Sequence, residues 1–172
     1  MTFTLNAGTI EKTYYFEDIK IQQSGEYHII SFENTFLTGK TGEPILPYNA
    51  IKLVLPPGEI AKAIEFIGED EIQIPGFFNI YPSQASRPLS DNSPSIFVVN
   101  DEIYNENSAY PENPLGELLT EYMNGYAIGL SSFTPLRYNP VTGMVSYYKK
   151  VKIKITRGNV AAIASEVNTN SK

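Results

Sequence analysis

The longest regular segment of this chain, residues 144–155, alternates apolar with polar side chains. One parity carries Val145, Tyr147, Lys149, Val151, Ile153 and Ile155, and the other carries Ser146, Tyr148 and three lysines. Because successive side chains of a β-strand point to opposite faces, the pattern predicts a half-buried strand with a lysine-rich solvent face. Asn-Pro and Thr-Gly pairs within residues 132–143 predict turns that lead into this strand.

Shorter apolar runs predict further strands along the rest of the chain. They lie at residues 13–17, 18–23, 27–32, 50–55, 61–68, 71–74 and 126–133, with another short apolar run at 118–123. Residues 61–68 could also form a helix, but their alternation favours a strand. Ser24-Gly25-Glu26 indicates a hairpin between the second and third of these runs. Many short strands, regular turns and no long helical pattern predict an all-β fold, an antiparallel β-sandwich of jelly-roll type. We assign residues 1–157 to this sandwich and 158–172, small and polar, to a flexible C-terminal linker.

The longest polar stretch, residues 81–94, contains three prolines and predicts a loop. A loop of this length inside a compact domain is commonly functional or disordered. It contains Arg87, one of only three arginines in the chain. Arg137 stands beside a predicted turn, and Arg157 stands at the end of the predicted sandwich.

Composition narrows the class of protein. The 172 residues suffice for one domain, and the absence of cysteine excludes disulfides, thiolate zinc sites and a cysteine nucleophile. A formal net charge of -6 argues against nucleic-acid binding, because phosphates require a basic surface. No apolar run approaches the roughly 20 residues of a membrane span. Residues 1–6 do not resemble a signal peptide, so we expect either a cytoplasmic protein or an export signal missing from this chain.

The search for reactive groups predicts neither an enzyme nor a cofactor or metal site. His28 is the only histidine, and it lies in a predicted strand rather than in a triad or zinc motif. The acidic groups at residues 69–71 and 101–102 lack the calcium-loop spacing and are expected to be solvated surface. A paired-carboxylate glycosidase remains open, since the separation of two carboxylates in space decides that chemistry. The twelve tyrosines suit strand packing, or a sugar-binding face.

Several motifs occur in an order that resembles a known family. Residues 42–47, Gly-Glu-Pro-Ile-Leu-Pro, precede a strand and Pro57-Gly58. The later motifs are Ile80-Tyr81-Pro82, Tyr104 with Tyr110-Pro111, and residues 134–143 with the closing strand. Together, from residue 42 to residue 155, they resemble the gingipain-type propeptide, the N-terminal prodomain of family C25 cysteine peptidases.

The resemblance implies a β-sandwich prodomain that assists folding of a secreted or cell-surface cysteine peptidase and keeps it latent. The catalytic residues would belong to a downstream or cognate C25-type peptidase domain, which would be the partner. The resemblance also implies an inhibitory loop formed by Ser86, Arg87, Pro88 and Leu89, in which Arg87 occupies the primary specificity pocket. The alternative for Arg87 is an ordinary solvated side chain. The alternatives for the chain are an adhesive or carbohydrate-binding β-module and a hydrolase of unrecognised type.

Overall fold

The computed structural model describes residues 8–86 and 96–159. Along this part of the chain the elements follow one another in the order β1 Thr9–Tyr15, β2 Lys20–Ser24, β3 Tyr27–Ser31, β4 Phe36–Thr38, β5 Leu46–Leu55, β6 Glu59–Ile74, α1 Asp101–Tyr104, β7 Leu119–Met123, β8 Tyr126–Phe133, β9 Leu136–Asn139 and β10 Met144–Asn159. The single described helix has four residues. None of the helical structure in the described ranges is long and apolar enough to cross a bilayer.

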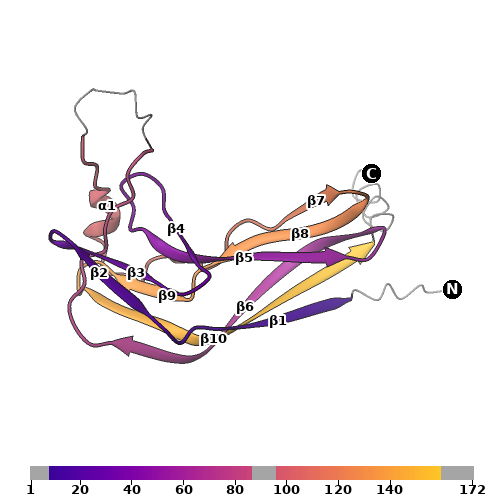
Figure 1. Cartoon of the computed structure of the whole chain (residues 1–172), viewed down its shortest axis with the longest axis horizontal. Helices are drawn as coiled ribbons and strands as arrows, with labels where there is room; N and C mark the ends of the chain where they lie inside the picture. The colour runs from indigo at the N-terminus through magenta and orange to yellow at the C-terminus, as the bar shows by residue number, and fades with distance from the viewer. Residues whose placement is uncertain (1–7, 87–95, 160–172) are drawn as a thin grey trace, which may run out of the picture.

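Two antiparallel sheets run along an elongated molecule (Figure 1). In the first sheet, β10 is the central strand. One of its edges pairs with β6, and its other edge pairs first with β9 and then with β1. The second sheet has the order β4-β5-β8-β7. The β2–β3 hairpin, turned at Gly25 with a φ of 64°, agrees with the prediction. The hairpin and α1 lie at one end of the molecule, and the β7–β8 turn lies at the other.

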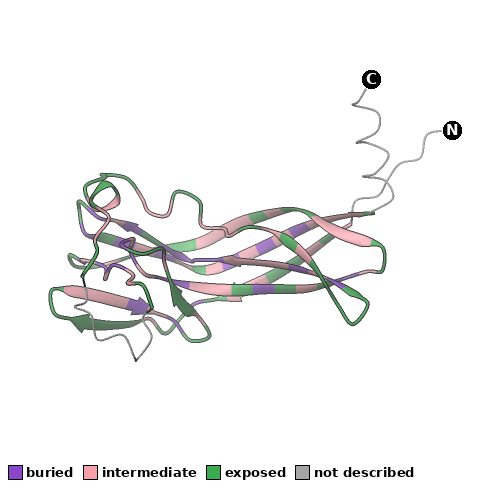
Figure 2. Cartoon of the chain, turned by 90° about the horizontal axis from the view of Figure 1, so that it is seen from above, coloured by how far each residue is buried: buried purple, intermediate pink, exposed green. Residues whose placement is uncertain are grey.

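The core joins the two sheets through aromatic side chains. Phe133 of β8 is completely buried, and its ring lies 4.9 Å from that of Tyr14, 5.9 Å from that of Phe16 and 6.0 Å from that of Phe66. These three partners belong to β1, the segment after it, and β6, so one side chain of the second sheet contacts two strands of the first. Buried residues recur along the strands in Figure 2. The predicted all-β antiparallel sandwich is therefore confirmed.

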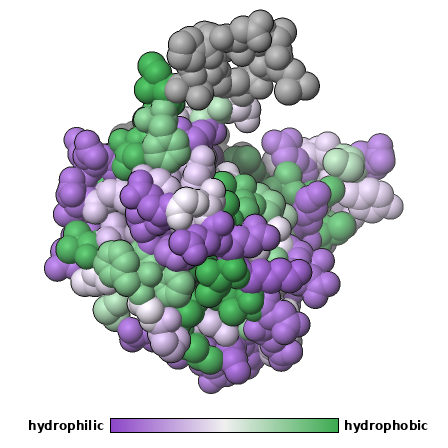
Figure 3. All heavy atoms as spheres, turned by 60° about the vertical axis from the view of Figure 1, so that its left-hand side comes forward, coloured by the Kyte–Doolittle hydropathy of each residue, from purple (hydrophilic) through white to green (hydrophobic). Residues whose placement is uncertain are grey.

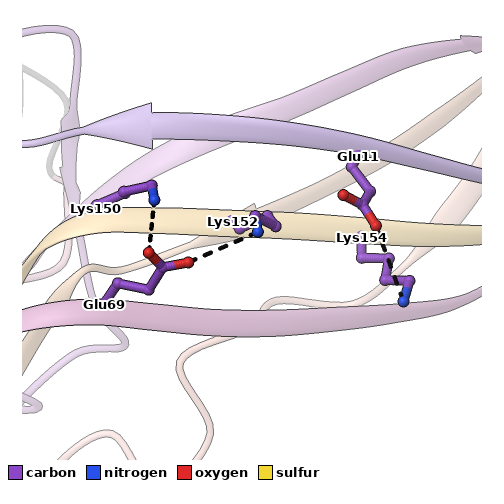
Figure 4. A network of polar contacts seen from close by, with 5 residues as sticks. All are labelled: Glu11, Glu69, Lys150, Lys152 and Lys154. Carbon is purple, nitrogen blue, oxygen red and sulfur yellow. Dashed lines mark hydrogen bonds and ion pairs between the residues drawn. The ribbon is translucent and has the colours of Figure 1, made fainter.

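The long alternating strand is also confirmed, with one correction to its solvent face. The side chains of Val145, Val151, Ile153 and Ile155 are buried, as predicted, but Lys149 of the same parity is exposed. The lysines of the other parity are half-buried and ion-paired rather than fully solvated (Figure 4). They pair with carboxylates from the neighbouring strands, because β10 lies in the middle of its sheet.

The Glu69 carboxylate of β6 accepts a hydrogen bond from Lys150 Nζ at 2.6 Å and lies 3.7 Å from Lys152 Nζ. The Lys150 hydrogen bond holds the pKa of Glu69 below its usual range, and the same pair raises the pKa of Lys150. On the other side of β10, Lys154 lies 3.9 Å from the carboxylate of Glu11 in β1. Opposite charges on adjacent strands therefore fix the lateral order β1-β10-β6 without burying an unpaired charge.

Several strand boundaries differ from the prediction: β5 already begins at Leu46, the short strands β4 and β9 were not predicted, and three further differences concern the sheet around β10. Residues 61–68 and 71–74, predicted as separate strands, belong to the single strand β6, which pairs with β10 from Ile74 to Glu59. Strand β1 covers Thr9–Tyr15 rather than residues 13–17. Strand β10 continues to Asn159, so residues 158 and 159 of the predicted linker lie in the sheet. In these last three cases pairing with β10 determines the extent of the strand.

Candidate functional site

The predicted inhibitory loop leaves the sandwich from a well-ordered base. We call residues 83–86 the first arm and residues 96–100 the second arm, and together they form the loop base. Ser86, at the end of the first arm, is exposed, and so is Ile96, at the start of the second arm. Arg87, Pro88 and Leu89 lie outside the described residues. Both arms stand beside α1, at the end of the molecule opposite the β7–β8 turn (Figure 1). The base therefore determines where the intervening residues begin and end.

Gly42 ties the two arms together. Its N–H donates to the carbonyl oxygen of Ser83 at 2.7 Å, and its own carbonyl oxygen accepts from the N–H of Asn100 at 2.9 Å. Ser83 N–H in turn donates to the Glu43 carbonyl oxygen at 2.8 Å. Gly42 has a φ of 86°, and a Cβ there would lie 3.0 Å from the Asn100 nitrogen. Glycine is required because it adopts this conformation without strain and leaves room for the second arm.

Gln84 makes a second cross-link, through its side-chain amide. Its Nε2 donates to the carbonyl oxygens of Pro82 and Val98, both at 2.9 Å, and its Oε1 accepts from the Val98 N–H at 3.0 Å. The Gln84 amide thus pairs with both the N–H and the carbonyl oxygen of Val98, in the way that the backbone of a neighbouring strand does. The two arms are held together only two residues before Ser86.

The second arm ends in the short helix α1. The Asn100 side chain accepts from the N–H of Glu102 at 3.1 Å, which caps the first turn. The Tyr104 hydroxyl, at the end of the helix, donates to the carbonyl oxygen of Ile80 at 2.6 Å. Burial raises the pKa of Tyr104 far above its ordinary value, so the hydroxyl stays protonated and keeps donating at any ordinary pH. Tyr104 therefore fastens the second arm to the segment that leads into the first.

A second tyrosine holds the Gly42 segment from the side. The Tyr110 hydroxyl donates to the Glu43 carboxylate at 2.9 Å. Burial, and then the hydrogen bond to Glu43, raise the pKa of Tyr110 above its ordinary value. The backbone of Tyr110 exchanges two hydrogen bonds with Tyr138 of β9, at 2.6 and 2.9 Å. These contacts connect the loop base to the first sheet.

An apolar platform surrounds the loop base. The rings of Tyr27, Tyr81 and Phe97 contact one another, with centroid distances of 5.5 to 5.7 Å. Ile96 and Phe97 have exposed fractions of 83% and 48%. Figure 3 shows apolar side chains on this end of the molecule, and an open cavity of about 350 Å³ is lined by residues that include Tyr81, Ile96 and Phe97. Exposed aromatic side chains gathered on one surface are typical of a protein-binding site.

The other residues singled out in the sequence either have contacts typical of the fold or lie exposed on a strand. His28 Nδ1 accepts a hydrogen bond from the N–H of Asn79 at 3.2 Å, and its ring lies against Phe78 in β-strand packing. Arg137 is exposed on β9, and Arg157 pairs with Glu59. Within residues 8–86 and 96–159, no group of three or more histidine, aspartate or glutamate side chains is arranged to hold a metal ion.

The loop was predicted from the sequence, but the residues that hold it were not identified. Residues 42–47 were noted as a motif, whereas the tie made by Gly42 and the cross-link made by Gln84 had no local signal. Tyr27 belonged to a predicted strand, and no sequence signal marked Phe97, which follows the predicted loop. Their roles depend on contacts between segments far apart in the chain.

We expect Gly42→Ala to loosen the loop base. The new Cβ would meet the Asn100 nitrogen at 3.0 Å at a positive φ, so the free energy of unfolding should fall by about 1–3 kcal/mol. Amide hydrogen exchange at Asn100 and Val98 should accelerate. Gly58→Ala is the matched control, because Gly58 has a φ of 76° with nothing within 4 Å of a new Cβ. Equal exchange at the loop base in both variants would contradict the role of Gly42.

The described structure is that of an almost entirely β-stranded module in which residues 83–84 and 98–100 are held together by Gly42 and Gln84. A family model, Propeptide_C25, matches residues 11–171. The chain therefore belongs to the Propeptide_C25 family, the propeptides of C25 peptidases. A comparison with curated proteins finds no match.

Two solved structures from Porphyromonas gingivalis share the fold. One concerns the zymogenic latency of gingipain K; it has 18% sequence identity and a TM-score of 0.73, and the alignment covers 88% of each chain. The other is a complex of the RgpB pro- and mature domains, with 19% identity and a TM-score of 0.67 over 91% of this chain and 83% of that one. At these identities the likeness shows the fold, and the family model shows the family.

Proposed function

We propose that this chain is the prodomain of a C25-type cysteine peptidase, that it binds the peptidase domain and keeps it latent, and that it assists folding of that domain. Membership of the propeptide family supports the role, as do relatives studied as a zymogen and as a pro–mature complex. The observation that carries the proposal is the loop base, where Gly42 hydrogen-bonds both arms. A loop fixed at its base binds with a smaller loss of conformational entropy than a free segment does.

We also propose that the chain is not itself catalytic. It has no cysteine, and its one histidine, His28, is engaged by the backbone of Asn79. The reactive groups would be those of the peptidase domain. The precursor would be secreted or displayed at the cell surface, as the peptidases with gingipain-type propeptides are.

Within the loop, we assign Arg87 the central role and Ser86, Pro88 and Leu89 a supporting one. A guanidinium pairs bidentately with a carboxylate at the floor of a specificity pocket. Pro88 follows directly, and proline is rigid and lacks an N–H, which protects the Arg87–Pro88 bond from cleavage. The loop would thus bind as a substrate does without being cut.

The test is inhibition of the cognate peptidase domain by the purified 172-residue chain. We expect inhibition at stoichiometric ratios and formation of a one-to-one complex on gel filtration. The complex should bury at least the ~1,200 Å² typical of specific pairs. A peptidase that is neither bound nor inhibited would refute the latency role.

A further inference from the structure

The outward side of the β5–β8–β7 sheet carries large apolar side chains. Leu119 pairs with Leu130, Val54 with Ile128, and Met123 with Tyr126, and directly paired residues project on the same side of a sheet. We call these six residues the outer apolar face. Val54, Met123 and Tyr126 have exposed fractions of 64%, 62% and 59%, and Ile128 and Leu130 are half-buried.

The inward side of the same strands packs against β6. A Cβ at Gly129 would be 3.5 Å from the Cβ of Ala61 in β6. The Ala61 N–H donates to the Thr120 hydroxyl of β7 at 3.0 Å. The two layers therefore approach each other closely at Gly129, while the large inward side chains of Leu55 and Phe133 are buried in the core.

Close approach of the layers does not explain why the outer residues are apolar. The first sheet shows how this chain builds a solvent face, with Lys150 and Lys152 paired to Glu69. On this side of the three strands, Lys52 lies opposite Leu130, and Glu121 lies opposite Ile128, between Leu119 and Met123 of β7. A contiguous apolar surface with a polar rim is typical of a protein-binding site.

We propose that the outer apolar face is a second docking surface for the peptidase domain, separate from the inhibitory loop; the inference rests on the proposed function. The position of the chain end identifies this occupant. Asn159, the last residue of β10, pairs with Glu59, which follows the end of β5 after a turn of three residues. The last described strand therefore ends at the same end of the molecule as the β7–β8 turn, which borders the outer apolar face (Figure 1).

A peptidase domain that follows a propeptide in one chain, on the C-terminal side of β10, would be held at this end of the molecule at a high effective concentration. The loop base lies at the opposite end of the molecule, so contact at both places would orient the peptidase along the length of the prodomain.

The experiment compares two double variants for binding to the cognate peptidase domain, inactivated at its nucleophile. Val54→Glu with Tyr126→Glu places two charges on the outer apolar face. Val141→Glu with Tyr15→Glu is the control, because these side chains are 46% and 68% exposed elsewhere and the change in charge is the same. We expect the first pair to weaken binding by at least about 30-fold and the second by less than about threefold, with melting temperatures unchanged.

The outcomes are separable. If the wild-type chain binds and both double variants bind equally, the docking surface is wrong while the proposed function stands. If the wild-type chain does not bind, both are overturned. The free chain could also form a dimer. If Val54→Glu with Tyr126→Glu abolishes that dimer and the control pair does not, the occupant is a second copy of the chain and the proposal is overturned.

Hydrogen exchange on the wild-type chain provides a test that needs no variant. We expect amide protection on binding in two places, the loop base around Val98 and the free edge of β7 from Leu119 to Met123. Protection confined to the loop base would also overturn the second docking surface.

Discussion

Inhibition of the peptidase by an Arg87→Ala variant should be weaker than that by the wild-type chain by well over tenfold. Truncating one partner of a buried charge pair typically costs about 2–5 kcal/mol, much of it from the charge left unpaired in the pocket. Because Arg87 belongs to the exposed polar loop predicted from the sequence, the melting temperature should not change. Inhibition constants and thermal unfolding of the two proteins provide the measurement.

Arg137→Ala is the matched control for this variant. Arg137 is exposed on β9, so its loss removes the same charge from a different surface. It should leave the inhibition constant within about threefold of wild type, as expected for a residue outside the contact. An Arg87→Ala chain that inhibits as well as wild type would remove Arg87 from the mechanism without affecting the loop base.

Phe133→Ala should cause the largest loss of stability of any single truncation considered for this chain. Phe133 is completely buried and contacts three aromatic rings from the opposite layer. Replacing such a side chain with alanine leaves a cavity and costs about 3–5 kcal/mol in the free energy of unfolding. Denaturant unfolding followed by circular dichroism is the measurement.

Phe77→Ala serves as its control, since Phe77 is 66% exposed, and it should cost less than about 1 kcal/mol. Phe133→Leu keeps much of the volume and should fall between the two, which preserves the test if the alanine variant does not fold. Comparable stability of Phe133→Ala and Phe77→Ala would contradict a core in which Phe133 joins the two sheets.

The loop base and the outer apolar face lie at opposite ends of the molecule, so the contributions of Arg87 and of this face to binding should be independent. Effects of substitutions that share no partners generally add. The free-energy changes caused by Arg87→Ala and by Val54→Glu with Tyr126→Glu are therefore expected to sum. This arrangement separates recognition of the active site from attachment of the domain.

The sequence by itself determined the fold class and the position of the loop. Alternation over residues 144–155 is a local property of the chain, and it predicted both β10 and its buried parity. Proline and polar residues in 81–94 are likewise local signals, because each restricts its own backbone or competes for its hydrogen bonds. The family motifs also pointed to a propeptide, because their order along the chain can be seen without the structure.

Only the tertiary structure decided how far each strand runs and what holds the loop. Strand β6 is continuous because β10 offers pairing partners along its whole length. Gly42 and Gln84 bind segments distant in sequence, so no local pattern marks them. In β8 both parities contain apolar side chains, and alternation cannot tell which one faces inward. Packing against the first sheet decides it, because Gly129 lies opposite Ala61 of β6 and Phe133 contacts Tyr14 and Phe66.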